Sequence, residues 1–517
     1  MPFLYRLHSH HTLSAQHLRH ALELIITKHQ SLRTSLIFHT GNNQQLQQIF
    51  DMNNSIRQLF TFIESTYETD EQLNEILHDE KLNPRFFDLA QGLVFRCHII
   101  YYKQISSDDL LSDRDVVILN VHHALFDFPS MNIFLHDLNQ AYTIGHLSYD
   151  DNSLLRYLDY ATIERQISMT GASMFWADVL HGCKLDQPLS LPFDRYRLSN
   201  EYRSDRGTSI SFDFGQDLSH DFLIHASSNN ISLDYLTFAI YFIFLFKLTN
   251  GQTDLCIAMN INNNRYRDEL KSIIGLFENV IPLRCQLDTH RSFQYLLDYV
   301  REITSNSMKY SYFPLQRILN QHPHISKPAF LDISFQFLSS ITRSNNKLIT
   351  IGNSQLSPIP FTMSMNDNEI RNKCDFSFLI QHDMNMNQLS CTINASLDLF
   401  NVETIDKISQ RFHSMLKQLF TSVDDQMSRP IYEISLTLAN ERLLMQSMNN
   451  TQVSFSSPVT CIHHEFVYQV MKHPQKLAVE LDEQSLTYAE LLHYVQVLSL
   501  HLMNNYHIKP GDIVCQC

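Results

Sequence analysis

The stretch that decides how this chain folds is VVILNVHHALFDFPS, at residues 116–130. Its first part, Val116–Val121, is a largely apolar and β-branched run, and short runs of this kind are typical of covered strands. His122 and His123 follow directly, and Asp127 stands four residues after the second histidine. Imidazole titrates near neutral pH, and a carboxylate can orient it or hold the adjacent loop. The stretch therefore predicts a buried strand that ends in an acid–base site.

Two other interpretations of the histidine pair stay open on the residues alone. The chain has 27 histidines, and adjacent pairs also occur at residues 10–11 and 463–464, so a pair without chemistry is ordinary here. His and Asp are also zinc ligands. However, the sequence has no Cys-x-x-Cys pair, and the His-Glu pair at 464–465 lacks the second histidine of a His-Glu-x-x-His helix. We therefore expect no metal.

Composition indicates a globular protein of two or three domains, because 517 residues exceed one ordinary core. The formal net charge of -15 argues against nucleic acid and anionic membranes as partners.

The longest apolar run, Leu236–Phe246, is too short to span a bilayer and predicts a buried helix. The start, Met1–Arg6, lacks the pattern of a signal peptide. Nine scattered cysteines fit buried free thiols in a reducing compartment, so we expect a cytoplasmic protein.

Helical and strand-like patterns alternate along the chain, which predicts an α/β fold, with two domains of ordinary size. Helices are expected over residues 15–30, 131–142, 217–248 and 402–420, and through most of 150–183. Strands are expected near residues 35–38, 93–101, 116–121, 210–214, 255–259, 280–285, 332–338, 374–380 and 389–396. Residues 421–460 are polar and fit a linker. A new pattern begins at Cys461, and the chain stops within the apolar run 513–517, which predicts a truncated sequence.

Several segments, in the same order, resemble the condensation domain of a nonribosomal peptide synthetase. His122–Asp127 matches the family's His-His-x-x-x-Asp motif, and Ile274–Arg284 resembles its Ile-Gly-x-Phe-x-Asn-x-x-Pro-Leu-Arg segment. The other matching segments are Lys28–Thr34, Tyr157–Ala161, Phe175–Trp176, Leu191–Arg195, Gly251–Asp254, Arg265, Lys373–Phe376 and Leu397–Phe400. Further on, Leu486–Leu491 and Lys509–Asp512 are similar to the opening of an adenylation, or AMP-binding, domain.

The resemblance implies an α/β fold with two lobes like those of chloramphenicol acetyltransferase. Each lobe would be a mixed sheet with flanking helices, and the two would be arranged around a central tunnel. We expect the first lobe at residues 1–178 and the second at 179–425. Residues 426–460 would be a linker, and 461–517 a small α/β segment, the truncated start of an adenylation domain.

The resemblance also implies an acyltransferase-type enzyme of secondary metabolite biosynthesis. An upstream carrier domain would bring an aminoacyl or peptidyl thioester, on a phosphopantetheine arm, to one mouth of the tunnel. A downstream carrier would bring an aminoacyl acceptor to the other mouth, and an amide bond would form between the two. No cofactor would bind directly. ATP and magnesium would serve only the missing part of the adenylation domain, which acts in cis.

The resemblance implies that His123 is the catalytic residue. A neutral imidazole at this position could accept the proton of the attacking amine or hold the amine by a hydrogen bond. Holding two tethered reactants in register would itself contribute strongly, since well-oriented reactions can gain ~7–11 kcal/mol. Asp127 is implied to pair with Arg265 from the other lobe and so lock the loop, since the planar guanidinium meets a carboxylate at two points. We assign His122 mainly to loop geometry.

The walls of the tunnel are expected to include Phe128, Ser130 and Asn279, and a backbone N–H just beyond Asp127 is a candidate donor to the oxyanion. Glycine usually follows the motif aspartate in this family, whereas here the next residues are Phe128 and Pro129. Glycine permits positive φ and a close approach of the substrate arm. Phe128 adds bulk, and Pro129 restricts it to extended backbone. We therefore expect an altered loop or a narrowed tunnel.

Two alternatives to an amide-forming enzyme follow from these departures. The family's first block, a Ser-x-x-Gln segment, is absent, and Ile163 stands where tryptophan is common. Phe128 and the clipped ends of the sequence favour a non-catalytic or degenerate carrier-docking fragment. An ester-forming or epimerising member of the same superfamily would carry the same histidine motif, because an alcohol nucleophile needs the same base.

Overall fold

The structure is a computed structural model of the 517-residue chain. It describes residues 1–39, 44–50, 60–147, 155–196, 203–204, 206–325, 327–340, 348–359, 374–420, 429–449, 461–481, 484–506 and 508. The chain divides into two compact units, Met1–Leu438 and Ala439–Cys517. Much of the expected linker, together with Lys373, Lys509–Asp512 and the apolar end at 513–517, lies outside the described residues.

The first unit contains two six-stranded mixed sheets. The strand order in the first sheet is β13-β14-β1-β8-β6-β5, and only β5 and β6 pair in parallel. Its strands are β1 (Pro2–Leu7), β5 (Thr61–Tyr67), β6 (Phe95–Tyr102), β8 (Val116–Val121), β13 (Ile349–Ile351) and β14 (Ser354–Pro358). The helices against it are α1 (Ala15–Lys28), α2 (Asp70–Leu82) and α3 (Ser130–Ile144).

The predicted strand before the histidine pair is confirmed as β8, and all six of its residues are buried. Side chains alternate across a strand, so each face of β8 needs its own cover. Val117 and Leu119 pack in the cluster that includes α1 and α3, whereas Val116 and Ile118 pack in the cluster that includes α2. Burial on both faces explains why β8 is a nearly continuous run of apolar residues and does not alternate apolar with polar residues.

The second sheet has the order β11-β10-β12-β15-β16-β9 and is also mixed, with β12 parallel to both β10 and β15. Its strands are β9 (Gly207–Asp213), β10 (Asp254–Ile261), β11 (Asn279–Gln286), β12 (Ile333–Ser340), β15 (Phe376–Asp383) and β16 (Gln388–Ser396). The helices in the same core are α5 (Thr170–Val179), α6 (Gln216–Ser228), α7 (Leu233–Leu248), α8 (Phe293–Lys309), α9 (Leu315–Asn320) and α10 (Val402–Phe420).

The apolar run at residues 236–246 forms most of α7, and every residue of that run is buried. The helix thus has no polar face, which is typical of a helix enclosed in a large core. None of the described helices is long and apolar enough to cross a membrane by itself. Only α6 and α7 taken together pass a test of length and composition, and they are bent by 115° at their break.

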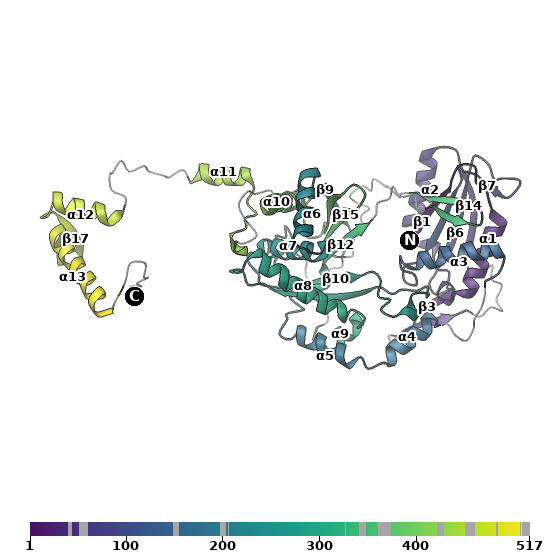
Figure 1. Cartoon of the computed structure of the whole chain (residues 1–517), viewed down its shortest axis with the longest axis horizontal. Coiled ribbons are helices and arrows are strands. Elements are labelled where there is room, and N and C mark those ends of the chain that lie inside the picture. The colour runs from purple at the N-terminus through teal and green to yellow at the C-terminus, as the bar shows by residue number, and fades with distance from the viewer. Residues whose placement is uncertain are drawn as a thin grey trace. The chain divides into compact units, whose positions relative to one another are not determined.

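Two segments depart from the lobe ranges that we expected. Strands β13 and β14 come from the range given to the second lobe, yet β14 pairs with β1 in the first sheet. Figure 1 shows β14, in green, beside the purple strands of that sheet. Conversely, α5 falls in the range given to the first lobe, but its Trp176 is buried in the core of the second sheet. The division at residue 178 therefore does not separate the two cores.

Shorter elements complete the first unit. They are β2 (Leu13–Ser14), β3 (Thr34–His39), β4 (Gln44–Ile49), β7 (Leu110–Leu111) and α4 (Tyr157–Gln166), with 3-10 turns at Gln30–Arg33, Pro84–Phe86, Asp268–Leu270, Ala329–Asp332 and Ile431–Glu433. The second unit consists of α11 (Ala439–Met448), α12 (Ile462–Lys472), β17 (Leu477–Leu481), β18 (Gln484–Thr487) and α13 (Tyr488–Tyr506). The expected helix, strand and helix after Cys461 are thus present.

Candidate functional site

The histidine pair lies on a tight loop between the end of β8 and the start of α3. The N–H of His122 donates to the carbonyl of Val94 at 2.9 Å, which fixes the loop to the chain just before β6. The N–H of Leu125 then donates to the carbonyl of His122, and α3 begins at Ser130. A strand and a helix of the first core therefore hold both ends of the motif.

His122 supports the loop from a half-buried position. Its Nδ1 accepts a hydrogen bond of 3.2 Å from the N–H of Ala124, and its ring meets that of Phe87 edge-on at 5.4 Å. Burial, followed by the nearby His123 and the chain's amino terminus, lowers the pKa of His122 to about 4. The imidazole is therefore neutral at physiological pH. Because Nδ1 accepts, its proton lies on Nε2.

His123 is exposed, and its ring stacks on that of His122 with the centroids 4.9 Å apart. A stacked neighbour limits the orientations of the imidazole without covering it. An incoming nucleophile can therefore reach the ring from solvent. This is the placement that a general base or a positioning group requires.

Asp127 is fully buried and lies at the centre of a network that joins the two cores. Arg265, which follows β10, donates to its two carboxylate oxygens at 2.6 and 2.9 Å. The N–H and hydroxyl of Ser130 and the N–H of Phe277 also donate to this carboxylate. Since a carboxylate offers about four lone-pair sites, these five donors occupy them. They leave Asp127 unsuited to the zinc ligation that the sequence left open.

The segment around Gly275 closes over this network. Its carbonyl accepts from the N–H of Asp127, and its own N–H donates to the Ser130 hydroxyl at 3.1 Å. The Tyr157 hydroxyl donates to the carbonyl of Leu276 at 2.9 Å. A Cβ atom added at Gly275 would overlap the ring of Tyr157. The glycine is therefore needed here for close approach rather than for an unusual φ.

Two of the side chains expected along the tunnel have structural tasks. Ser130 is fully buried, and Arg265 Nη2 donates to its hydroxyl at 2.8 Å, so it belongs to the buried network and not to a tunnel wall. The Asn279 amide donates to the carbonyls of Ser311 and Phe313 and accepts from the N–H of Leu315. It therefore holds the loop that leads into α9. The sequence alone does not show which groups will form hydrogen bonds with a short polar side chain such as that of Ser130 or Asn279.

Phe128, the third of these side chains, is 68% exposed, and its ring lies 5.7 Å from that of Phe3. The residue has no positive φ, as expected before Pro129. Phe128 thus stands on the surface of the loop that carries His123, beside the half-buried Phe3 of β1.

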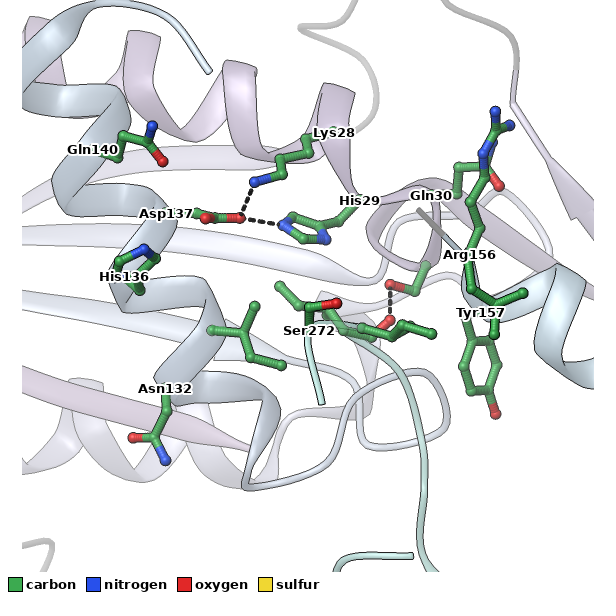
Figure 2. Close-up of a pocket in the computed structure, with 15 residues that line it drawn as sticks. Lys28, His29, Gln30, Asn132, His136, Asp137, Gln140, Arg156, Tyr157 and Ser272 are labelled. Carbon is green, nitrogen blue, oxygen red and sulfur yellow. Dashed lines mark hydrogen bonds and ion pairs between the residues drawn. The ribbon is translucent and has the colours of Figure 1, made fainter. Parts of the chain in front are cut away.

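A cavity of about 540 Å³ lies on the first core, beside the segment that contains Ile274. Figure 2 shows Lys28 and His29 directed at Asp137 of α3, with contacts of 2.9 and 2.6 Å. Burial alone would raise the pKa of Asp137, but the hydrogen bonds from His29 and Lys28 outweigh it and lower that pKa. Burial lowers the pKa of His29 despite the carboxylate. Our sequence analysis missed Asp137, because nothing in a helix pattern marks its partner 108 residues away.

Residues that could bind a metal occur in the second unit. The ligand atoms of Cys461, His463 and His464 lie within 4.8 Å of one another, and all three residues are exposed. This cluster includes the second histidine pair of the sequence. It is outside the first unit, which contains the network around Asp127.

Comparison with known proteins agrees with this fold. Bacitracin synthase 1 of Bacillus licheniformis is 26% identical over 97% of the chain, and malpinin synthetase of Mortierella alpina is 25% identical over 97%. The chain spans only 9% and 6% of the length of these two relatives.

Two solved structures share the fold, the two-lobe α/β fold of condensation domains. The condensation domain from Monacolin K polyketide synthase matches with a TM-score of 0.62 and 15% identity, over 83% of this chain and 93% of that one. A four-domain nonribosomal peptide synthetase bound to AMP and glycine matches with a TM-score of 0.66 and 17% identity, over 99% of this chain and 37% of that one. The family model for the condensation domain matches residues 4–442, and the chain therefore belongs to the condensation domain family.

Proposed function

We propose that this chain is the condensation domain of a nonribosomal peptide synthetase and joins two carrier-bound substrates through an amide bond. The observation that carries the proposal is the exposed His123 on a loop locked by the buried Asp127–Arg265 pair. The relatives that this chain resembles over almost its whole length are named as synthases or synthetases, and one structure with the same fold is a nonribosomal peptide synthetase, which supports the same reaction class.

In this reaction the amine of the acceptor attacks the carbonyl carbon of the donor thioester. Attack develops positive charge on the nitrogen, and the imidazole of His123 accepts the proton or holds the amine by a hydrogen bond. The tetrahedral intermediate then collapses, the thiol of the donor arm leaves, and the amide remains on the acceptor arm. No step of this sequence needs a metal ion or a redox group.

The oxyanion of the intermediate needs a hydrogen-bond donor, and the loop narrows the choice. Pro129 carries no N–H, and the N–H of Ser130 donates to Asp127. Among the three residues after Asp127, the N–H of Phe128 is therefore the candidate donor. Its side chain stands beside the same position, so Phe128 would both stabilise charge and limit the space for the substrate.

The partners that we propose are an upstream and a downstream carrier domain, whose phosphopantetheine arms enter a tunnel between the lobes. We also propose that the second unit is the start of an adenylation domain. The family match ends at residue 442, yet the relatives align with 97% of the chain, so they include counterparts of the second unit. ATP and magnesium would belong to the remainder of that domain.

The decisive experiment loads an upstream and a downstream carrier domain with aminoacyl thioesters and mixes them with the chain. Intact-protein mass spectrometry should show a dipeptidyl product on the downstream carrier and an unloaded thiol on the upstream one. Carrier binding without any product would support a docking fragment instead. An ester formed with a hydroxyacyl acceptor, or an inverted stereocentre without an amide, would support the other superfamily activities.

A further inference from the structure

Two cysteines from distant parts of the chain meet beside the second sheet. Cys183 follows α5, where its N–H donates to the carbonyl of Leu180 at 3.0 Å, and Cys256 lies on β10. The two side chains lie close enough for each to shift the pKa of the other, and neither cysteine forms a disulfide in this structure. Both residues are half-buried, in contrast to the buried Cys97, Cys285 and Cys391.

Arg284 of β11 holds this contact in place. It stands opposite Cys256 in the β10–β11 register. Its Nη1 donates to the carbonyls of Val179 and His181 at 3.0 and 2.8 Å, just before Cys183. Its Nε and Nη2 donate to Asp254 of β10 at 2.8 and 2.7 Å. One guanidinium therefore fastens the turn after α5 to the strand that carries the second thiol.

The surroundings give the two sulfur atoms different reactivity. The hydrogen bond from Cys256 lowers the pKa of Cys183, and the charge of Arg284 acts in the same direction. The same contact and burial raise the pKa of Cys256. A thiolate is the nucleophile in thiol chemistry, and cationic neighbours favour it. Cys183 is thus suited to react first, with Cys256 as the thiol that resolves the product.

We propose that Cys183 and Cys256 are a redox-sensitive pair that forms a reversible disulfide between the turn after α5 and β10. The oxidant is a peroxide. The Cys183 thiolate attacks one peroxide oxygen, which gives a sulfenic acid and releases water after protonation. The Cys256 sulfur then attacks the Cys183 sulfur, the S–O bond breaks and a second water leaves. Two thiols and one hydrogen peroxide thus give one disulfide and two waters, and an external dithiol reverses the change.

The bond would act on the part of the fold that Arg284 now holds through its hydrogen bonds and its ion pair with Asp254. The indole of Trp176 on α5 donates to the carbonyl of Tyr310 at 3.2 Å, so α5 is also tied to the loop before α9. A covalent link restricts the unfolded chain and resists the opening of this region. We expect the oxidised protein to melt at a higher temperature than the reduced protein.

Trypsin places the two cysteines in separate peptides, which makes the test direct. Cleavage after Arg165, Lys184, Lys247 and Arg265 gives the peptides 166–184 and 248–265, and each contains one cysteine. The full chain is treated with hydrogen peroxide, its remaining thiols are alkylated, and the digest is analysed by mass spectrometry. We expect one cross-linked pair of these peptides, which dithiothreitol separates.

The variants Cys183→Ser and Cys256→Ser should each abolish the cross-link and the rise in melting temperature on oxidation. Cys461→Ser, which removes an exposed thiol of the second unit, should retain both. Circular dichroism of the reduced variants shows whether they fold, and Cys183→Ala provides a second substitution if Cys183→Ser does not. Full alkylation of both cysteines after peroxide treatment would overturn the proposal, as would oxidation of Cys183 without a cross-link.

Discussion

Arg265 donates two hydrogen bonds, of 2.6 and 2.9 Å, to the carboxylate of Asp127, although 138 residues separate the two. Their side chains are 4% and 0% exposed, so the ion pair is almost completely removed from water. The net contribution of such a pair to stability is often small, because desolvation offsets the attraction. Loss of one partner is different, since it leaves the other charge buried without compensation.

We therefore predict that Asp127→Ala lowers the free energy of unfolding by about 3–5 kcal/mol. Arg265 would remain buried among groups arranged for a carboxylate, and the N–H of Phe277 would lose its acceptor. Urea denaturation followed by circular dichroism measures the change. The matched control is Lys271→Ala, which removes a pair with Asp268 on the surface. That variant should unfold like the unchanged protein, and equal stability of the two variants would contradict the prediction.

The close approach of Gly275 to Tyr157 gives a second prediction. Gly275→Ala should destabilise the protein by about 1–3 kcal/mol, because an added Cβ would overlap the aromatic ring and force a shift of packed atoms. Adding Tyr157→Leu to this variant should recover part of the loss, because the smaller side chain leaves room. Thermal unfolding of the single and double variants measures both effects.

Gly171→Ala is the control for this overlap, because no heavy atom beyond its chain neighbours and the backbone of its own helix lies within 4 Å of the Cβ that it adds. Gly171 lies in α5, where alanine is favoured over glycine by up to about 1 kcal/mol. This variant should be unchanged or slightly more stable. If Gly275→Ala behaved in the same way, the packing of Tyr157 would not be tight.

The parts of the fold that the sequence predicted well are those with a local pattern. The strand β8 and the central part of α7 are largely apolar runs, and their lengths distinguish a strand from a helix. The pairing of Asp127 with Arg265 has no such signal. It could be expected only through a resemblance to a family, because no spacing or periodicity connects residues in different cores.

The incorrect expectations share a physical cause. The addition of β13 and β14 to the first sheet depends on hydrogen bonds between backbones far apart in sequence, such as that from the N–H of Ile359 to the carbonyl of Leu4. Ser130 was assigned to a tunnel wall, but its hydroxyl is used by Asp127 and Arg265. In both cases the role of the segment or side chain is set by neighbours that are distant in sequence, and the residue types alone do not reveal it.

A third prediction concerns the pH dependence of stability. The pKa of His122 is about 4 in the folded protein, whereas an unfolded histidine titrates near about 6.5. Below about pH 6.5 the unfolded chain therefore binds more protons than the folded chain, so stability falls as the pH falls toward 4. Above about pH 6.5 neither state binds this proton, and the contribution is constant.

The variant His122→Asn should lose this part of the pH dependence, since asparagine keeps an acceptor near Ala124 but does not titrate. Other histidines whose pKa is lowered by burial, such as His29, respond in the same direction. The relevant quantity is therefore the difference between the urea midpoints of the two proteins, measured from about pH 7 to about pH 5. A constant difference over this range would show that His122 is not shifted.

A fourth prediction separates a surface aromatic from a core aromatic on the same loop. Phe128 is 68% exposed, so Phe128→Gly should change stability by no more than about 0.5 kcal/mol. We expect the same variant to raise kcat/KM for acceptors with bulky side chains, because it removes a ring beside the reacting groups. Phe126→Ala is the control, and it should cost about 3–5 kcal/mol because Phe126 is fully buried. A variant Phe128→Gly with unchanged selectivity would place the ring away from the substrate.

The fifth prediction tests His123 itself. His123→Ala should reduce the rate of amide formation by about 10²–10⁴-fold, the usual contribution of a positioned acid or base. The free energy of unfolding should not change, because the ring is exposed and supports no core. His136→Ala, which removes an exposed histidine from the cavity on α3, is the matched control and should retain full activity. Initial rates of product formation on the downstream carrier distinguish the two. Full activity of His123→Ala would leave the stacked imidazole without a role in the reaction, whereas a loss in both variants would indicate damage to the lobe rather than to its chemistry.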